Sequence, residues 1–187
     1  MTIKRLLLVY VLLQISTLSL QSLHMLAQGP QAFAPPFGPK YAQEWGCVCV
    51  HSLSALVVLM LGPPLLLRWK IGHRWLGRLY LLSAVVAGLS GIPLSVRAEG
   101  SPASFLILSL LWLRAAWGAY QTARARQWKE HRHWVQVHYL LAWSAVFLRL
   151  GLGVSEHLGV PLGQVTLPLA WLSWQPGFWL GWWRRLW

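Results

Sequence analysis

The sequence contains no aspartate, and its four glutamates are its only acidic side chains. Charged residues make up 11% of the chain, whereas 56% of it is hydrophobic. This composition excludes a soluble globular domain and predicts a membrane protein. None of the glutamates falls within a long apolar run, so neither paired-carboxylate hydrolysis nor an acidic proton relay has side chains to carry it.

Cysteine is also scarce, and the chain has only Cys47 and Cys49. On a helix, two residues that are two positions apart point to different sides, so this pair does not reach the geometry of a disulfide. Cys47 and His51 do share a helical face, which leaves metal capture open as an alternative. The simpler expectation is a pair of buried or interfacial thiols.

Long apolar runs are what the chain has instead. Six of them approach the length of about 20 residues that a helix needs to cross the hydrocarbon core of a bilayer. They predict an all-α integral membrane bundle of about six transmembrane helices, forming one membrane domain. Pro168 and Pro176 interrupt the last run, although membrane helices tolerate proline when neighbours satisfy the freed backbone groups. The expected spans are 6–26, 46–67, 75–97, 103–123, 134–154 and 161–183.

The first run begins like a secretion signal, because Lys4 and Arg5 precede it. No small-x-small cleavage pattern follows it cleanly, so we expect an uncleaved helix. Residues 27–45, which come next, are rich in proline and glycine and predict an irregular periplasmic loop.

Two patterns predict how the helices pack. Ala84, Ala87, Gly88 and Gly91 give the third span a seam of small residues, which allows close contact with another helix. The Gly-Pro-Pro sequence at 62–64 predicts a bend or an end of the second span.

The net charge of +12 comes from basic residues that lie between the apolar runs. Membrane topology explains this pattern better than nucleic-acid binding, so no nucleic-acid partner is expected. With the N-terminus in the cytoplasm, 12 of the 16 Lys and Arg fall on the cytoplasmic side, and only Lys40 and Arg97 fall outside. The positive-inside rule therefore predicts that both termini are cytoplasmic.

Histidines gather near the cytoplasmic ends of two expected spans. His73 opens the third span, and His131 and His138 lie at the start of the fifth. Imidazole is the commonest haem and metal ligand, and a bis-histidine haem needs one ligand from each of two neighbouring helices. We expect the two stretches to converge on one site. The alternative for each histidine is a hydrogen bond at a helix interface. On the periplasmic side, His51 and His24 mark a second, outer site.

Arg114 and Arg149 lie inside expected spans that contain no acid. A charge at the centre of a span costs at least ~2.5–3.5 kcal/mol on insertion scales unless it reaches carbonyls, water or an anion. A haem propionate, a quinone oxygen or a lipid phosphate each suits the guanidinium of Arg114. Arg74 and Arg78, at the start of the third span, are further candidates for holding such a group.

Several short blocks together resemble an uncharacterised family of predicted bacterial multi-pass membrane proteins. The resemblance extends from about residue 48 onward, and it implies the fold and a location in the bacterial inner (plasma) membrane without an established activity. Members often carry a basic residue three places after the tryptophan of the third block, where this chain has Val137 followed by His138. The blocks are His51 with Gly62-Pro63, His73-Arg74-x-Leu76-Gly77-Arg78-x-Tyr80, His131-Arg132-x-Trp134, Arg149-Leu150 and Trp171-Leu172-x-Trp174.

Two functional hypotheses follow. The first is a b-type cytochrome-like redox protein that binds haem b or quinone. The second is a noncatalytic accessory or structural subunit of a larger membrane complex, docking through the tryptophan-rich apolar surface near the C-terminus. Under either hypothesis the chain contacts the lipid bilayer. In the first, the axial ligands come from His51, His73, His131 and His138, and Arg74, Arg78 or Arg114 hold the propionates or the quinone.

Overall fold

The computed structural model describes residues 3–32, 42–67, 72–98 and 101–183. Every regular element within these ranges is helical, which confirms the expected all-α bundle. The elements are α1 (Ile3–Gln28), the short 3-10 helix η1 (Pro30–Ala32), α3 (Trp45–Leu66), α4 (His73–Val96), α5 (Pro102–Arg124), α6 (Trp128–Ala142), α7 (Ser144–His157), α8 (Leu162–Leu172) and α9 (Gln175–Trp183).

Five helical stretches in the described ranges are long and apolar enough to cross a membrane, and they coincide with the first five expected spans. The fifth stretch, Trp128–His157, combines α6 and α7, which meet at Trp143. The sixth expected span, 161–183, is instead divided into α8 and α9, of 11 and 9 residues. Each is shorter than the ~20 residues that a crossing needs. Pro176 lies in the first turn of α9, where its missing N–H suits a new helix rather than a continuing one.

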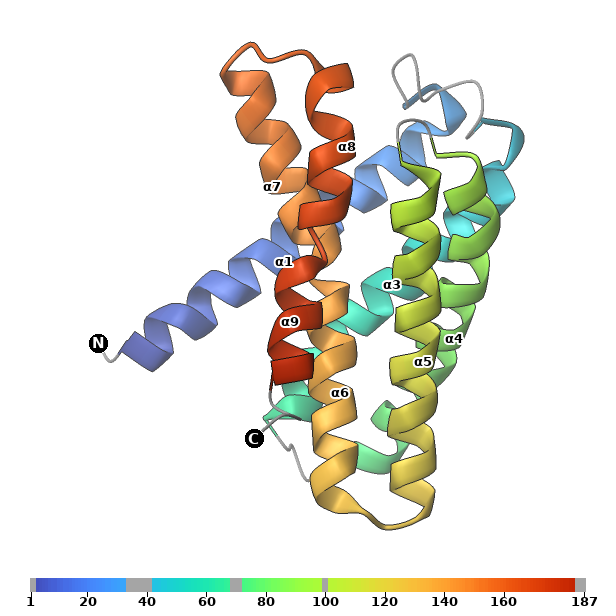
Figure 1. Cartoon of the computed structure of the whole chain (residues 1–187), viewed down its shortest axis with the longest axis vertical. Helices are drawn as coiled ribbons and strands as arrows, with labels where there is room; N and C mark the ends of the chain where they lie inside the picture. The colour runs from blue at the N-terminus through green and yellow to red at the C-terminus, as the bar shows by residue number, and fades with distance from the viewer. Residues whose placement is uncertain (1–2, 33–41, 68–71, 99–100, 184–187) are drawn as a thin grey trace.

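The core consists of α3, α4, α5 and α6, and helices adjacent along the chain pack against each other (Figure 1). The small-residue seam of α4 is buried, as expected. The indole of Trp112 on α5 donates a hydrogen bond to the carbonyl of Ala84, at 2.7 Å. A Cβ at Gly88 would lie 2.5 Å from Leu113 Cδ2, so glycine is needed for α5 to approach this closely. The prediction of close helix contact along the seam is confirmed.

The contact between α3 and α6 depends on Gly62. A Cβ at this position would lie 1.9 Å from the ring of Tyr139, so the aromatic ring rests directly on the α3 backbone. The Tyr139 hydroxyl donates to the carbonyl of Leu59 at 3.2 Å. The helix ends at Leu66, soon after the two prolines, as the Gly-Pro-Pro sequence predicts.

The remaining helices surround this core. In Figure 1, α1 crosses the bundle obliquely, and the hairpin of α7 and α8 extends past the ends of α4 and α5. Helix α9 lies along α6, where a Cβ at Gly177 would come within 2.7 Å of the Leu140 backbone and one at Gly181 within 2.6 Å of Val137 Cγ2. The apolar Val137 is thus part of the α6–α9 contact.

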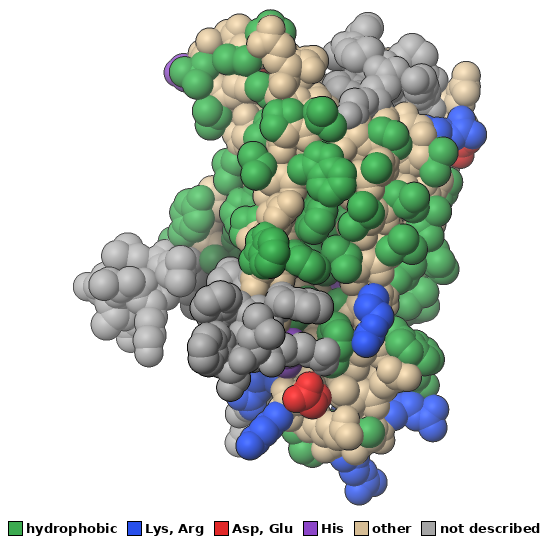
Figure 2. Space-filling view, in the orientation of Figure 1, with side chains coloured by type: hydrophobic (Ala, Val, Ile, Leu, Met, Phe, Trp, Pro, Cys, Tyr) green, Lys and Arg blue, Asp and Glu red, His purple; other side chains and the backbone are tan. Residues whose placement is uncertain are grey.

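Hydrophobic side chains cover the middle of the face shown in Figure 2, and Lys and Arg gather mainly at its lower end. This end is formed by the start of α4, the end of α5 and the start of α6. The arrangement is that of a multi-pass membrane protein with one basic end. Other residues of the expected charge pattern, Arg68, Lys70, Arg184 and Arg185, lie outside the described residues, as do residues 33–41 of the expected loop, which include Lys40.

Candidate functional site

His138 lies at the centre of the buried polar cluster and has no exposed surface. Its Nδ1 is 2.7 Å from the hydroxyl oxygen of Tyr80 on α4. Trp112 of α5 packs on the imidazole, with the ring centroids 4.4 Å apart. One side chain from each of three helices therefore meets within the core.

The hydrogen bond constrains the protons of this cluster. When the Tyr80 hydroxyl donates to Nδ1, a neutral His138 carries its proton on Nε2. No described residue supplies a hydrogen-bond partner for that Nε2 atom. Leaving a buried polar atom unpaired costs about 1–3 kcal/mol. A bound group that formed a hydrogen bond with Nε2 would therefore gain the most free energy of any contact with this cluster.

The two histidine stretches meet through Tyr80 and His138, which come from the third and fifth expected spans. His73 itself is exposed at the start of α4. His131 donates from Nδ1 to the carbonyl oxygen of Ala119 on α5, 2.9 Å away, and so links the ends of α5 and α6. The contact between the two stretches was expected, and the residues that make it are a tyrosine and the deeper histidine.

The candidate arginines near the basic end are exposed, and Arg78 lies over the ring of Trp75, with 4.8 Å from Cζ to the ring centroid. Arg74, at the start of the same helix, is also exposed. Arg149 donates a hydrogen bond from Nη2 to the Ser22 hydroxyl of α1, at 3.3 Å. Arg74 and Arg78 therefore remain candidates for an anionic group by their position alone, whereas the guanidinium of Arg149 contacts α1.

Arg114 has a partner within the chain. Its Cζ lies 4.5 Å from the ring centroid of Trp134, in a cation–π contact between α5 and α6. The indole is seated over Gly118, where a Cβ would lie 2.4 Å from Trp134 Cδ2. A cation–π contact contributes from about 0.5 to 2 kcal/mol depending on desolvation, so the ring offsets part of the cost of a charge in the span.

His51 lies in the half of the core away from the basic end. Its Nδ1 donates to the carbonyl oxygen of Ala87, 2.9 Å away, which places the bare lone pair of a neutral ring on Nε2. A cavity of about 90 Å³ lies beside the ring. Its lining residues come from α3, α4, α5, α6 and α7: His51, Ala55, Leu59, Ala87, Gly88, Leu108, Ser109, Trp112, Ala142, Ser144 and Ala145.

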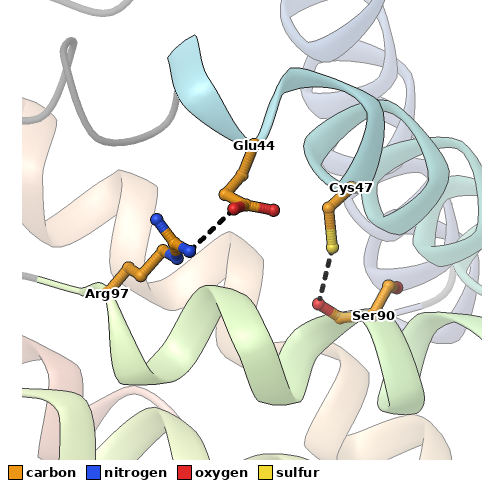
Figure 3. Close-up of polar contacts among 4 residues, drawn as sticks. All are labelled: Glu44, Cys47, Ser90 and Arg97. Carbon is orange, nitrogen blue, oxygen red and sulfur yellow. Dashed lines mark hydrogen bonds and ion pairs between the residues drawn. The ribbon is translucent and has the colours of Figure 1, made fainter.

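Polar contacts continue from His51 to the outer end of α3 and α4 (Figure 3). The thiol of Cys47 donates to the carbonyl oxygen of Ser90 at 3.3 Å, and Arg97 forms a 2.8 Å ion pair with Glu44. Both cysteines are free thiols, as the sequence predicts. Within the described part of the chain, no group of three or more His, Cys, Asp or Glu side chains is arranged to hold a metal ion.

The histidines partly suit a haem. In His51 and His131, Nδ1 donates a hydrogen bond to a backbone carbonyl. Histidines that ligate a metal usually make such a bond with one ring nitrogen, which leaves the other nitrogen, here Nε2, to bind the metal. The space does not suit it, because ligand pockets usually measure ~300–1,000 Å³ and the cavity beside His51 measures about 90 Å³. As packed, the described helices do not accommodate a porphyrin or a quinone ring at this position.

The fold and the site together define a multi-pass helical membrane protein with a polar cluster buried in a four-helix core. The family of predicted membrane proteins designated DUF2306 matches residues 48–183, and the chain belongs to this family. The finding confirms the expected membership of an uncharacterised membrane-protein family. No curated protein and no solved structure matches the chain.

Three side chains of the site were not among the sequence candidates: Trp112, Ser109 and Ser144. None of them carries a charge or belongs to a histidine block, so the search for ligating residues passed over them. The available signal was size complementarity, because a large aromatic residue on α5 fits the small-residue seam of α4. The two serines have no comparable signal in the sequence.

Proposed function

We propose that the chain is a noncatalytic subunit that binds a transmembrane helix of a partner protein through the hairpin of α7 and α8. The observation that carries this proposal is an open apolar groove of about 450 Å³ along the hairpin. Apart from Ser155 its lining is apolar or glycine, and it consists of Leu150, Gly151, Val154, Ser155, Leu158, Val160, Val165, Pro168 and Leu169.

The groove is bordered by surface that the chain itself leaves open. Val154 and Leu158 are 58% and 69% exposed. A Cβ built at Gly153 would meet nothing within 4 Å, so the α7 backbone is accessible there. Small residues let helix backbones approach closely in membranes, which favours a helix over a lipid chain as the occupant.

The position of the hairpin supports the same conclusion. It extends past the ends of α4 and α5 in Figure 1 and is not enclosed by the four-helix core. The groove on the hairpin is therefore open to a helix from another chain. In contrast, the tryptophan-rich segment is partly used internally, because the indole of Trp174 is buried and donates to Ser104 Oγ at 2.9 Å. The docking surface is therefore assigned to the hairpin.

The test is purification in mild detergent followed by native mass spectrometry. We expect the wild-type chain to carry a membrane protein in fixed stoichiometry, and Val154→Trp and Leu158→Trp, both at lining positions of the groove, to lose it. Leu110→Trp is the matched control, because Leu110 is 53% exposed on α5, outside the groove. Recovery of the wild-type chain alone, or equal partner recovery with groove and control variants, contradicts the proposal. Self-association lost in the groove variants would identify a second copy as the occupant and would contradict it too.

Redox function with haem b or a quinone is the second candidate. What favours it is the buried Nε2 of His138, which lacks a partner among the described residues and carries a lone pair in the tautomer whose Nδ1–H donates to the Tyr80 hydroxyl. Binding there would require the core helices to separate, because the nearby cavity holds only about 90 Å³. An absorption spectrum of freshly isolated protein, with pyridine extraction, tests it: a Soret band that His138→Leu abolishes supports haem. The absence of such a band, with no uptake of added haem, contradicts it.

A further inference from the structure

We infer that the cavity beside His51 binds a small cluster of water molecules, and that water reaches it from the side of the membrane that the charge distribution marks as outer. The site is formed by α3, α4, α5 and the α6–α7 junction, and it is separate from the docking groove.

The size and lining of the cavity fit water. At ~30 Å³ per molecule, a volume of about 90 Å³ corresponds to about three waters. An internal water needs two to four polar partners, whereas purely apolar cavities stay empty. Here the polar side chains are His51, Ser109 and Ser144, which come from three different helices.

His51 is prepared to accept a hydrogen bond from such a water. Its Nδ1–H is held by the Ala87 carbonyl, so Nε2 carries the lone pair. The Ser109 hydroxyl lies on the same side, because a Cβ at Gly91 would be 2.9 Å from Ser109 Oγ and 3.4 Å from His51 Cε1. Glycine at position 91 therefore lets both side chains pack closely against the α4 backbone beside the cavity.

We place the route along the interface between α3 and α4, which carries the two polar contacts drawn in Figure 3. Glu44, Cys47 and His51 recur at three- and four-residue steps along α3, so they share one face. They lie opposite α4, whose Ser90 and Arg97 meet Cys47 and Glu44. At ~1.5 Å per residue, His51 lies about 10 Å along the helix from Glu44. On the other side of the cavity, the buried indole of Trp112 is fixed on the Ala84 carbonyl, which closes the way toward His138.

Silver ion is a suitable probe, because it is close to water in size and reacts with cysteine thiolates, which form only where water is present. Ser109→Cys would be made in the full chain together with Cys47→Ser and Cys49→Ser, so that the protein carries a single thiol. The protein would be reconstituted in two vesicle preparations, one for each orientation of the chain in the membrane. The readout is protection of the new thiol from later alkylation, measured by mass spectrometry. We expect silver added on the outer side to protect it about tenfold faster than silver added on the cytoplasmic side.

Two matched variants separate access from general disorder of the protein. Leu110→Cys lies on the same helix but on the exposed surface of the bundle, away from the cavity. Its thiol should stay unprotected whichever side the silver is added to. Ala55→Leu, in the lining of the cavity, should slow protection of Ser109→Cys about tenfold by filling the cavity. Ala103→Leu, at an exposed position outside the lining, should not. Each variant is first shown to elute as a folded monodisperse protein. Absence of protection from both sides, faster protection from the cytoplasmic side, or indifference to Ala55→Leu overturns the inference.

Discussion

Tyr80 and His138, separated by 58 residues in the chain, are joined by a 2.7 Å hydrogen bond in the buried core. The bond ties α4 to α6, and Trp112 on α5 covers it. It also connects the two histidine-containing stretches of the sequence at a depth where water does not compete. A buried side-chain pair of this kind contributes most when one member is removed, because the other is left unpaired.

Replacing Tyr80 by phenylalanine should lower the free energy of unfolding by about 1–3 kcal/mol, because Nδ1 of His138 then loses its hydrogen-bond partner. The double variant with His138→Leu should cost less than the sum of the single changes, since no polar atom is stranded. Reversible unfolding in mixed micelles measures both. Tyr10→Phe, at an exposed position on α1, should be neutral. Strictly additive effects of Tyr80 and His138 would disprove the coupling.

Gly62→Ala should destabilise the protein by about 1–3 kcal/mol through overpacking. The new Cβ would lie 1.9 Å from the Tyr139 ring, so α3 and α6 must separate. Gly46→Ala is the control on the same helix, because its Cβ meets nothing within 4 Å. In a Tyr139→Ala background, Gly62→Ala should cost less, because the ring that the new Cβ meets is gone. Unfolding curves for the wild type, the three single variants and the double variant test this, and equal stability of Gly62→Ala and Gly46→Ala would refute the packing argument.

Much of the fold follows from the sequence, because crossing a bilayer constrains helix length and composition so strongly. The small-residue seam of α4 and the end of α3 were also predictable, because glycine and proline affect the backbone locally. The division of 161–183 into α8 and α9 was not predicted. Hydropathy alone does not distinguish a continuous span from two short helices that meet at Ser173 and Trp174.

The site was less predictable. Histidine blocks indicated which helices meet, but not that Tyr80, rather than His73, reaches His138. That choice depends on helix rotation and depth, which a local motif does not contain. Similarly, the sequence showed that Arg114 needs a partner and suggested bound anions, whereas the structure supplies the indole of Trp134. A search of the sequence for acidic partners overlooks aromatic rings, although their faces also bind cations.

The Arg114–Trp134 contact should appear as a coupling energy. A double-mutant cycle with Arg114→Gln and Trp134→Leu isolates the pair from the other contacts of the indole. We expect a coupling of about 0.5–2 kcal/mol, the range for cation–π contacts from exposed to desolvated sites. Trp128→Leu combined with Arg114→Gln is the control cycle, because Trp128 is an exposed tryptophan on α6, the helix that carries Trp134. Equal coupling in both cycles would contradict a specific contact.

The ion pair between Glu44 and Arg97 should contribute little, although its 2.8 Å separation is short. The side chains are 29% and 43% exposed, so water and salt screen their attraction. Glu44→Gln should therefore change the free energy of unfolding by less than ~1 kcal/mol, and raising the salt concentration should reduce the difference further. Unfolding at low and high ionic strength measures this. A large loss that persists in high salt would mean that the pair is desolvated and holds the outer ends of α3 and α4 together.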